Sequence, residues 1–332
     1  MNIADMSLNL YSFGYSAGFI NDPNNHSTSI SLNGLVERSR SLELGGIEFP
    51  FDRFYALGNL HEGVDFLKNL NDQNINFYLD FENFDTSYLK KLIPILSKEN
   101  IKSARIKMDQ YGETIYGGNR FRSKSFKDAK KDFIKKLTIM SCFLKEYDFT
   151  LAIENHQDLS SIELIEIISE IDSDFIGINW DIGNSISCLD TPDSFYDRTK
   201  DFIRNVHLKD YKVFESEQGI RLVRCPIGDG YVDFKKLLKL IYRNENITSY
   251  SIELGAQITR ESFIKQDAYW NEFDSHPIKK SDFFEFVNTI SLQHGSSLSA
   301  FEEGFTGKAL IESEDSEVRK SVANLSKISE QI

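Results

Sequence analysis

The chain is poor in the residues that mark several protein classes. It has 3 cysteines among 332 residues, and Cys142, Cys188 and Cys225 show no CxxC spacing. Such usage argues against a disulfide framework or a thiolate zinc site and fits a reducing compartment. No apolar run approaches the ~20 residues that a membrane-spanning helix needs, and the N-terminal segment lacks the pattern of a signal peptide. We therefore expect a soluble, cytoplasmic protein with no membrane partner.

Positive charge is also scarce. Lys and Arg number 38 against 51 Asp and Glu, which gives a formal net charge of −13. An acidic surface repels phosphate backbones, so the composition disfavours nucleic acid as a partner.

Apolar residues make up 40% of the chain and aromatic residues 13%, enough for one large core. Eight short β-rich runs alternate with longer helical stretches, and several of the runs are almost continuously apolar, as buried parallel strands require. The expected strands are Leu8–Phe13, Gly46–Phe49, Asn76–Leu79, Ser103–Lys107, Thr150–Glu154, Phe175–Asp181, Ile203–Leu208 and Ser249–Leu254.

Helical periodicity is clearest in Ser125–Tyr147 and in Asp233–Tyr242. A further helix is expected from about Ser161, with Asp158 or Ser160 as its N-cap. Eight alternating βα units favour closure into a (β/α)8 TIM barrel, an α/β fold, as a single domain.

Two segments depart from this repeat. Asp109–Lys124 is a long loop rich in Gly and Tyr after the fourth strand, and loops of this length often act as lids. We assign residues 1–303 to the barrel and residues 304–332 to a C-terminal extension. That extension either forms an amphipathic helix over Val318–Ile328 or is partly disordered.

Four of the late strands end in residues that can bind a metal. Glu154, Asp181, His207 and Glu253 stand at these ends, spaced by about one βα unit with an insertion before the last. The C-terminal ends of barrel strands point into one shared site. A lone acid after a strand is more often a helix cap, but three buried carboxylates side by side are costly without a cation. The pattern predicts one divalent ion: Mn²⁺, Mg²⁺, Co²⁺ or Zn²⁺.

Other residues are candidates for contact with a substrate. His156 and Lys209 each follow a ligand by two residues, which puts them on the same side of an extended segment. The alternative for His156 is that it orients Glu154 without touching the substrate, and the alternative for Lys209 is an ion pair with Asp210. Asn184 follows Asp181 by three residues and is the third candidate. Glu48, at the end of the second strand, faces the same site if the register holds.

Five motifs in order, AIENHQD, INWDIGN, VHLKD, PIGDGYVDF and SIELG, resemble the xylose isomerase-like TIM-barrel superfamily, specifically its sugar phosphate isomerase/epimerase family. The resemblance covers roughly residues 8 to 254. It implies one divalent metal, usually Mn²⁺, Mg²⁺ or Co²⁺, held by Glu154, Asp181, His207 and Glu253. It also implies a carbohydrate substrate and, as one candidate assembly, a homodimer.

The chain departs from two branches of that superfamily. Ketose 3-epimerases usually carry a His and an Arg where this sequence has Asn184 and Val213, so the resemblance leaves the 3-epimerase reaction open. Endonuclease IV-type relatives use a trinuclear zinc cluster with many histidines, whereas this chain has 6 in all.

The first functional hypothesis is a metal-dependent isomerase or epimerase acting on a sugar, sugar acid or sugar phosphate. Glu154 and Glu253, on strands at different sides of the site, are the catalytic pair that exchanges a proton beside a carbonyl. The second is a lyase like inosose or 3-dehydroshikimate dehydratase. The third, a non-catalytic sugar-binding barrel, is disfavoured by the complete ligand set.

Overall fold

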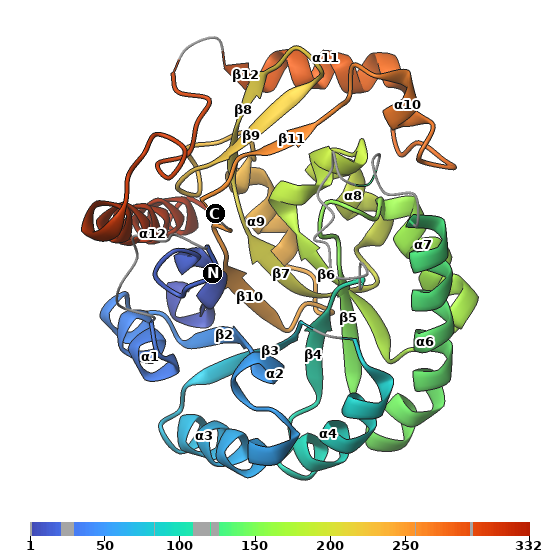
Figure 1. Ribbon diagram of the computed structural model, residues 1–332, viewed down its shortest axis with the longest axis vertical. Helices are drawn as coiled ribbons and strands as arrows, with labels where there is room; N and C mark the ends of the chain where they lie inside the picture. The colour runs from blue at the N-terminus through green and yellow to red at the C-terminus, as the bar shows by residue number, and fades with distance from the viewer. Residues whose placement is uncertain are drawn as a thin grey trace.

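The computed structural model describes residues 2–20, 30–82, 84–108, 120, 126–255, 257–292 and 295–332. Eight parallel strands close into a barrel in the order β1-β10-β7-β6-β5-β4-β3-β2, which confirms the predicted TIM barrel. Figure 1 shows the strands in the centre with the helices around them. The strands are β1 (Ser7–Asn9), β2 (Gly46–Pro50), β3 (Asn76–Phe81), β4 (Ser103–Ile106), β5 (Thr150–Glu154), β6 (Ile176–Asp181), β7 (Ile203–Leu208) and β10 (Ser249–Ile252).

The first strand is shorter than expected. Asn9 accepts a hydrogen bond from the Tyr11 backbone N–H through its side chain, and residues Leu10–Phe13 turn into a 3-10 helix, η2. A side-chain cap of this kind competes with the extended backbone, so the strand ends at Asn9 although the residues that follow are apolar.

Helices cover the outside of the barrel. The helices predicted from the sequence begin close to the expected residues. Ser160, one of the two proposed caps of α7, forms a capping box with Glu163. The helices of at least eight residues are α1 (Leu32–Ser41), α3 (Leu60–Asp72), α4 (Thr86–Lys98), α6 (Phe126–Tyr147), α7 (Ser161–Ile171), α8 (Pro192–Thr199), α9 (Phe234–Tyr242), α11 (Lys280–Ile290) and α12 (Gly307–Ser329). None of the helices in the described residues is long and apolar enough to cross a bilayer. Apart from Arg120, the predicted loop Asp109–Lys124 lies outside the described residues.

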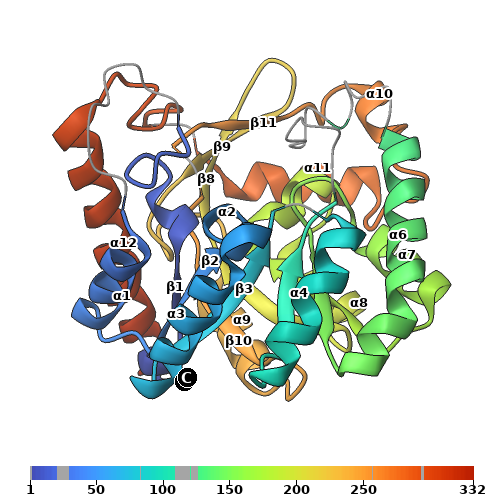
Figure 2. The same ribbon diagram turned by 60° about the horizontal axis from the view of Figure 1, so that its bottom comes forward.

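A second sheet accounts for the insertion before the last barrel strand. Its order is β11-β9-β8-β12, where β8 (Tyr211–Glu215) and β9 (Ile220–Arg224) form a hairpin directly after β7. The short strands β11 (Arg260–Ser262) and β12 (Ser291–Leu292) flank the hairpin. Figures 1 and 2 both place this sheet beside one end of the barrel, with α11 lying along it. The sheet has its own apolar core, which includes Trp270 and Phe283.

The predicted C-terminal helix is present and longer than Val318–Ile328, since α12 spans Gly307–Ser329. Val318, Val322 and Leu325 belong to the same core cluster as the barrel strands. In both views α12 lies beside α1 and the N-terminal segment. The helix therefore buries its apolar face against the barrel.

Candidate metal centre and active site

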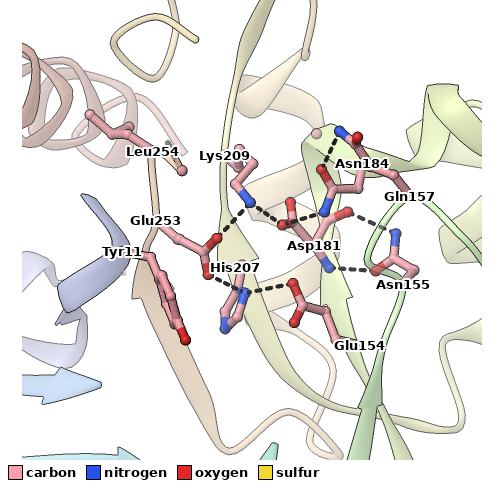
Figure 3. A network of polar contacts seen from close by, with 12 residues as sticks. Tyr11, Glu154, Asn155, Gln157, Asp181, Asn184, His207, Lys209, Glu253 and Leu254 are labelled. Atoms are coloured by element: carbon pink, nitrogen blue, oxygen red, sulfur yellow. Dashed lines mark hydrogen bonds and ion pairs between the residues drawn. The ribbon is translucent and has the colours of Figure 1, made fainter. Parts of the chain in front are cut away.

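The four predicted ligand residues meet at one end of the barrel. One ligand atom from each of Glu154, Asp181, His207 and Glu253 lies within 4.8 Å of every other, and all four residues are buried. Figure 3 shows their side chains pointing toward one another, with His207 between Glu154 and Glu253.

Strand register explains the convergence. Asp181 pairs with His207 across β6 and β7, and Ile252 pairs with Leu208 across β10 and β7. Glu253 stands one residue beyond β10, and its backbone N–H donates to the Leu208 carbonyl over 3.1 Å. Because parallel strands of a barrel end at the same face, adjacent registers bring their last polar residues together.

The His207 imidazole is held between carboxylates. Nε2 lies 2.8 Å from Glu48 Oε1, and Nδ1 lies 2.8 Å from Glu253 Oε2 and 3.8 Å from Glu154 Oε1. Burial lowers the pKa of His207, but Glu48 and Glu253 outweigh it, so the pKa stands well above the usual range. A histidine whose outer nitrogen contacts a carboxylate is the usual arrangement of a metal ligand. Nδ1 is the ring atom that faces the cluster.

Arg105 is the buried counter-charge of the site. Its guanidinium forms ion pairs with Asp80 and Glu154, and its Nε lies 3.6 Å from Glu48. Burial raises the pKa of Asp80 to about 8 against the pull of Arg105. Burial also raises the pKa of Glu154, but Arg105 and other nearby groups more than offset this and hold it below the usual range. Glu154 is therefore a carboxylate at neutral pH.

Lys209 links the other two acids. Its ammonium contacts Asp181 and lies 2.6 Å from Glu253 Oε1. Burial raises the pKa of Asp181 to about 7, although Lys209 acts in the opposite direction. The effect of burial on Glu253 is likewise upward, but Lys209 and His207 hold its pKa well below the usual value. The Lys209 ammonium thus pairs with Asp181 and Glu253, and the alternative of an ion pair with Asp210 is wrong.

The donor set suits a divalent cation. Three carboxylates and one imidazole are ligands that Mg²⁺, Mn²⁺ and Zn²⁺ accept. Among the described residues, Asp181 Oδ1 and His207 Nδ1 are buried and have no hydrogen-bond partner. His207 Nδ1 lies within 2.8 Å of Glu253 without hydrogen-bond geometry. Buried polar atoms left in this way are costly unless a ligand completes them, and these two belong to the four-residue cluster.

A cavity of about 390 Å³ opens above the cluster, and Glu154 and Glu253 form part of its wall. All three residues predicted to contact substrate, His156, Asn184 and Lys209, line the cavity. Asn184 also donates to Asp181 Oδ2 over 2.6 Å and accepts from Gln157 over 2.9 Å, as Figure 3 shows.

His156 stands apart from its neighbours in charge. Burial lowers its pKa to about 3, and the nearby Lys107, Lys209 and Arg105 act in the same direction. His156 is therefore neutral at physiological pH, with one ring N–H donor and one ring acceptor. The contact of His156, Asn184 and Lys209 with a substrate stays a prediction.

The PIGDG motif forms a turn around Asp210, the residue that follows Lys209. Gly228 and Gly230 donate their backbone N–H groups to Asp210 Oδ2, each over 2.9 Å. Gly228 has a φ of +86°, and a Cβ on Gly230 would lie 2.2 Å from Asp210 Oδ1. Both glycines therefore serve a tight turn around a buried carboxylate, as expected of turn residues.

Sequence reasoning placed Glu48 correctly by register and missed Asn9, Asp80 and Arg105. Asn9 Nδ2 donates to Glu253 Oε2 over 3.2 Å. The missed residues share one signal: each is a polar residue that stands between two apolar residues, as Asp80 does in NFYLDF and Arg105 in SARI. In a closed barrel such a residue must point into the interior, where it needs a partner.

A larger groove of about 780 Å³ lies away from these residues. Its lining includes Leu57, Asp85 and Tyr88, from the segments around α3 and α4. Its lining includes none of the four ligand residues. The smaller cavity, lined by Glu154 and Glu253, is therefore the candidate substrate site.

The fold and the cluster together define the class of the protein: a (β/α)8 barrel with a buried Glu-Asp-His-Glu centre at one end. A family model described as the xylose isomerase-like TIM barrel matches residues 108–270. This match, over about half of the chain, and the fold shared with solved structures support the superfamily that the five motifs suggest.

Curated relatives are distant and matched only in part. The 3-oxo-isoapionate decarboxylase of Pectobacterium atrosepticum is 26% identical over 141 residues, which cover 40% of this chain and 51% of the relative. The protein YihM of Escherichia coli is 23% identical over 207 residues, which cover 60% of this chain and 59% of the relative. The chain thus spans between half and three fifths of the length of these relatives.

Solved structures share the fold over most of the chain. A xylose isomerase-like barrel of Mycobacterium smegmatis, in complex with magnesium, has a TM-score of 0.56 at 13% identity and covers 87% of this chain and 99% of its own. The probable 3-DHS dehydratase AsbF of Bacillus anthracis has a TM-score of 0.54 at 13% identity and covers 75% and 92%. A sugar phosphate isomerase/epimerase of Parabacteroides distasonis has a TM-score of 0.54 at 12% identity and covers 98% and 94%. These likenesses support the fold.

Proposed function

We propose that the protein is a divalent-metal-dependent isomerase or epimerase that acts on a polyhydroxy carbonyl compound. The observation that carries the proposal is the position of His207 between Glu154 and Glu253, within a buried cluster of four metal-binding side chains. The proposed ligands are Glu154, Asp181, His207 and Glu253, with Mn²⁺, Mg²⁺ or Co²⁺ favoured and Zn²⁺ also compatible with the set.

A divalent cation bound here supplies Lewis acidity, which acidifies the C–H bond next to a substrate carbonyl. Glu154 and Glu253 approach the centre from β5 and from the end of β10, and in this proposal they flank the reacting carbon on two sides. In this proposal one carboxylate removes the proton and the other returns a proton from the opposite side. A carboxylate with a low pKa is a weak base, so the acidification of the substrate must supply much of the driving force.

The remaining polar residues orient and balance the pair. Arg105 holds Glu154 through an ion pair, and Lys209 holds Glu253 at 2.6 Å. His156, neutral at physiological pH, lines the cavity, and its proposed role is to donate to a substrate oxygen. Lys209 and Asn184 line the same wall and are the other proposed substrate contacts.

A lyase reaction is the second candidate. The curated relative at 26% identity is named a decarboxylase, and loss of CO₂ or of water begins from the same activated carbon. The four ligands and the two carboxylates would serve either outcome. The fate of the carbon skeleton separates the two functions.

The test is solvent exchange. The metal-loaded protein is incubated in D2O with a panel of ketoses, sugar acids, sugar phosphates and inososes, and NMR follows the C–H signals. Exchange with an intact carbon skeleton supports the isomerase or epimerase, whereas an olefinic, deoxy or decarboxylated product supports the lyase. Protein treated with a chelator is the control and should show no exchange. Absence of exchange with every compound, together with no bound metal by elemental analysis, contradicts both functions.

A further inference from the structure

The cavity above the four-residue cluster has differently charged side chains at its floor and in its upper wall. Its floor is made of carboxylates, and two buried cations, Arg105 and Lys209, are already paired with them. Among the described lining residues, its upper wall adds three cationic residues, Arg53, Lys107 and Arg260, and the carboxylate of Glu82.

Lys107 is placed by the alternation of its strand. It follows Arg105 by two residues at the end of β4, so both side chains leave the same side of the extended segment. Arg105 reaches the floor, where it contacts Glu154, and Lys107 lines the wall above it.

Lys107 takes no part in the ion pairs of the upper wall. Arg53 Nη1 lies 3.4 Å from Glu82 Oε1, and the Arg53 guanidinium stacks 4.1 Å from the centre of the Phe19 ring. Tyr11 also donates its hydroxyl to Glu82. Lys107 makes no hydrogen bond and no ion pair with the other described residues, although it is partly withdrawn from solvent.

A partly buried ammonium inside a binding cavity, on a protein of net charge −13, is complementary to an anion. The cavity of about 390 Å³ lies in the range that encloses small ligands. A molecule with hydroxyl or carbonyl oxygens toward the floor and a negative group toward Lys107 satisfies both ends.

We propose that Lys107 is the centre of an anion subsite in the upper wall of the cavity, and that the substrate is an anionic polyhydroxy compound, a sugar acid or a sugar phosphate. The inference rests on the proposed function for the identity of the reacting end. The negative group, carboxylate or phosphate, is bound away from the metal-binding residues. It therefore sets which compounds enter and takes no part in the proton transfer.

Three inert polyols test the subsite: D-glucitol, D-gluconate and D-glucitol 6-phosphate. None has an aldehyde or ketone group, so calorimetry on the magnesium-loaded protein measures binding alone. At least one anionic polyol should bind at least tenfold more tightly than D-glucitol. Tighter binding of the phosphate ester identifies a sugar phosphate as the substrate class, and tighter binding of gluconate identifies a sugar acid.

Variants assign the preference to Lys107. Lys107→Met should remove the tenfold preference and leave D-glucitol binding within twofold of the wild type, while Lys107→Arg should retain it. Lys135→Met, at an exposed position of α6, is the matched control and should change nothing. Equal binding of all three polyols, or a preference that survives in Lys107→Met, overturns the proposal.

The two proposals fail separately. Anion-selective binding without solvent exchange on any carbonyl compound would sink the proposed reaction and leave the subsite standing. Exchange on neutral ketoses at the same kcat/KM as on their phosphorylated or carboxylated counterparts would sink the subsite and leave the reaction standing.

Discussion

Glu48 and His207 form a buried pair that fixes the direction of the imidazole ring. Glu48 Oε1 lies 2.8 Å from His207 Nε2, and neither side chain is exposed to solvent. With Nε2 engaged, Nδ1 is the nitrogen that faces Glu154 and Glu253. Glu48 thus lies outside the proposed ligand set and still controls how one of its members points.

Removal of this carboxylate should weaken metal binding. We expect Glu48→Leu to lower the affinity for Mn²⁺ by about 10–100-fold, the range seen when outer partners of histidine ligands are lost. Glu48→Gln keeps an oxygen acceptor and should lose less. Competition with a fluorescent chelator measures both. An unchanged affinity in Glu48→Leu would show that the ring is held by other contacts.

Metal affinity should rise with pH. The raised pKa of His207 means that the imidazole is protonated in the metal-free protein at neutral pH, and burial raises the pKa of Asp181 to about 7. A cation that binds to Nδ1 and to the Asp181 carboxylate must displace their protons. Binding should therefore strengthen from about pH 6 to about pH 8 and release protons. Calorimetry in buffers of different ionisation enthalpy counts these protons, and a count of zero at pH 6 contradicts the assignment of these two ligands.

The ligand residues could be predicted from sequence because each stands at, or one residue before, the end of an expected strand. Glu154 after TLAI and Asp181 after IGINW mark where a buried strand ends, and the barrel rule alone brings such ends together. The expected strand bounds lie within two residues of the observed ones except at β1, where the Asn9 side chain caps η2 and shortens the strand.

The charge network of the floor was not predictable in the same way. Arg105 forms ion pairs with Asp80 and Glu154. The three residues come from three different strands, and no local sequence spacing connects them. Lys209 was expected to meet either a substrate or its neighbour Asp210, whereas it bridges Asp181 and Glu253. The Asp210 carboxylate instead accepts hydrogen bonds from the backbone N–H groups of Gly228 and Gly230. These residues are distant in sequence and meet only in the folded chain.

Glu253→Gln should abolish turnover with a smaller effect on folding. The amide has nearly the size of the carboxylate but cannot accept a proton from carbon, and loss of a positioned acid or base typically costs about 100-fold or more in rate. Solvent-exchange rates in D2O measure the change, and urea denaturation measures stability. Glu170→Gln, at an exposed position of α7, is the control. Full activity in Glu253→Gln would remove the end of β10 from the reaction.

Gly230→Ala should disrupt the turn around Asp210. The new Cβ would lie 2.2 Å from Asp210 Oδ1 and 2.5 Å from the Tyr211 carbonyl oxygen, so backbone or carboxylate must move. We expect a loss of about 1–3 kcal/mol in the free energy of unfolding, as for other strained substitutions. Gly58→Ala is the matched control, because its Cβ meets no atom within 4 Å. Equal stability of the two variants would mean that the turn adjusts freely.

Glu314 ties the C-terminal helix to the loop that forms one wall of the cavity. Its carboxylate accepts from the backbone N–H of Tyr15 over 2.8 Å, and from the N–H and hydroxyl of Ser16 over 3.0 and 2.7 Å. The side chain is completely buried, and Gly14, one residue before Tyr15, lines the cavity. The Glu314 carboxylate therefore connects α12 to the loop beside the cavity.

Glu314→Gln removes one of the two accepting oxygens and sets an amide N–H against backbone donors. We expect a loss of about 1–3 kcal/mol in stability, the cost of a buried donor left without an acceptor. Glu312→Gln is the control, since the Glu312 side chain is 65% exposed. Hydrogen exchange should accelerate at the Tyr15 and Ser16 amides in Glu314→Gln, because these N–H groups lose their acceptor. Unchanged exchange at both amides would show that the loop is held without α12.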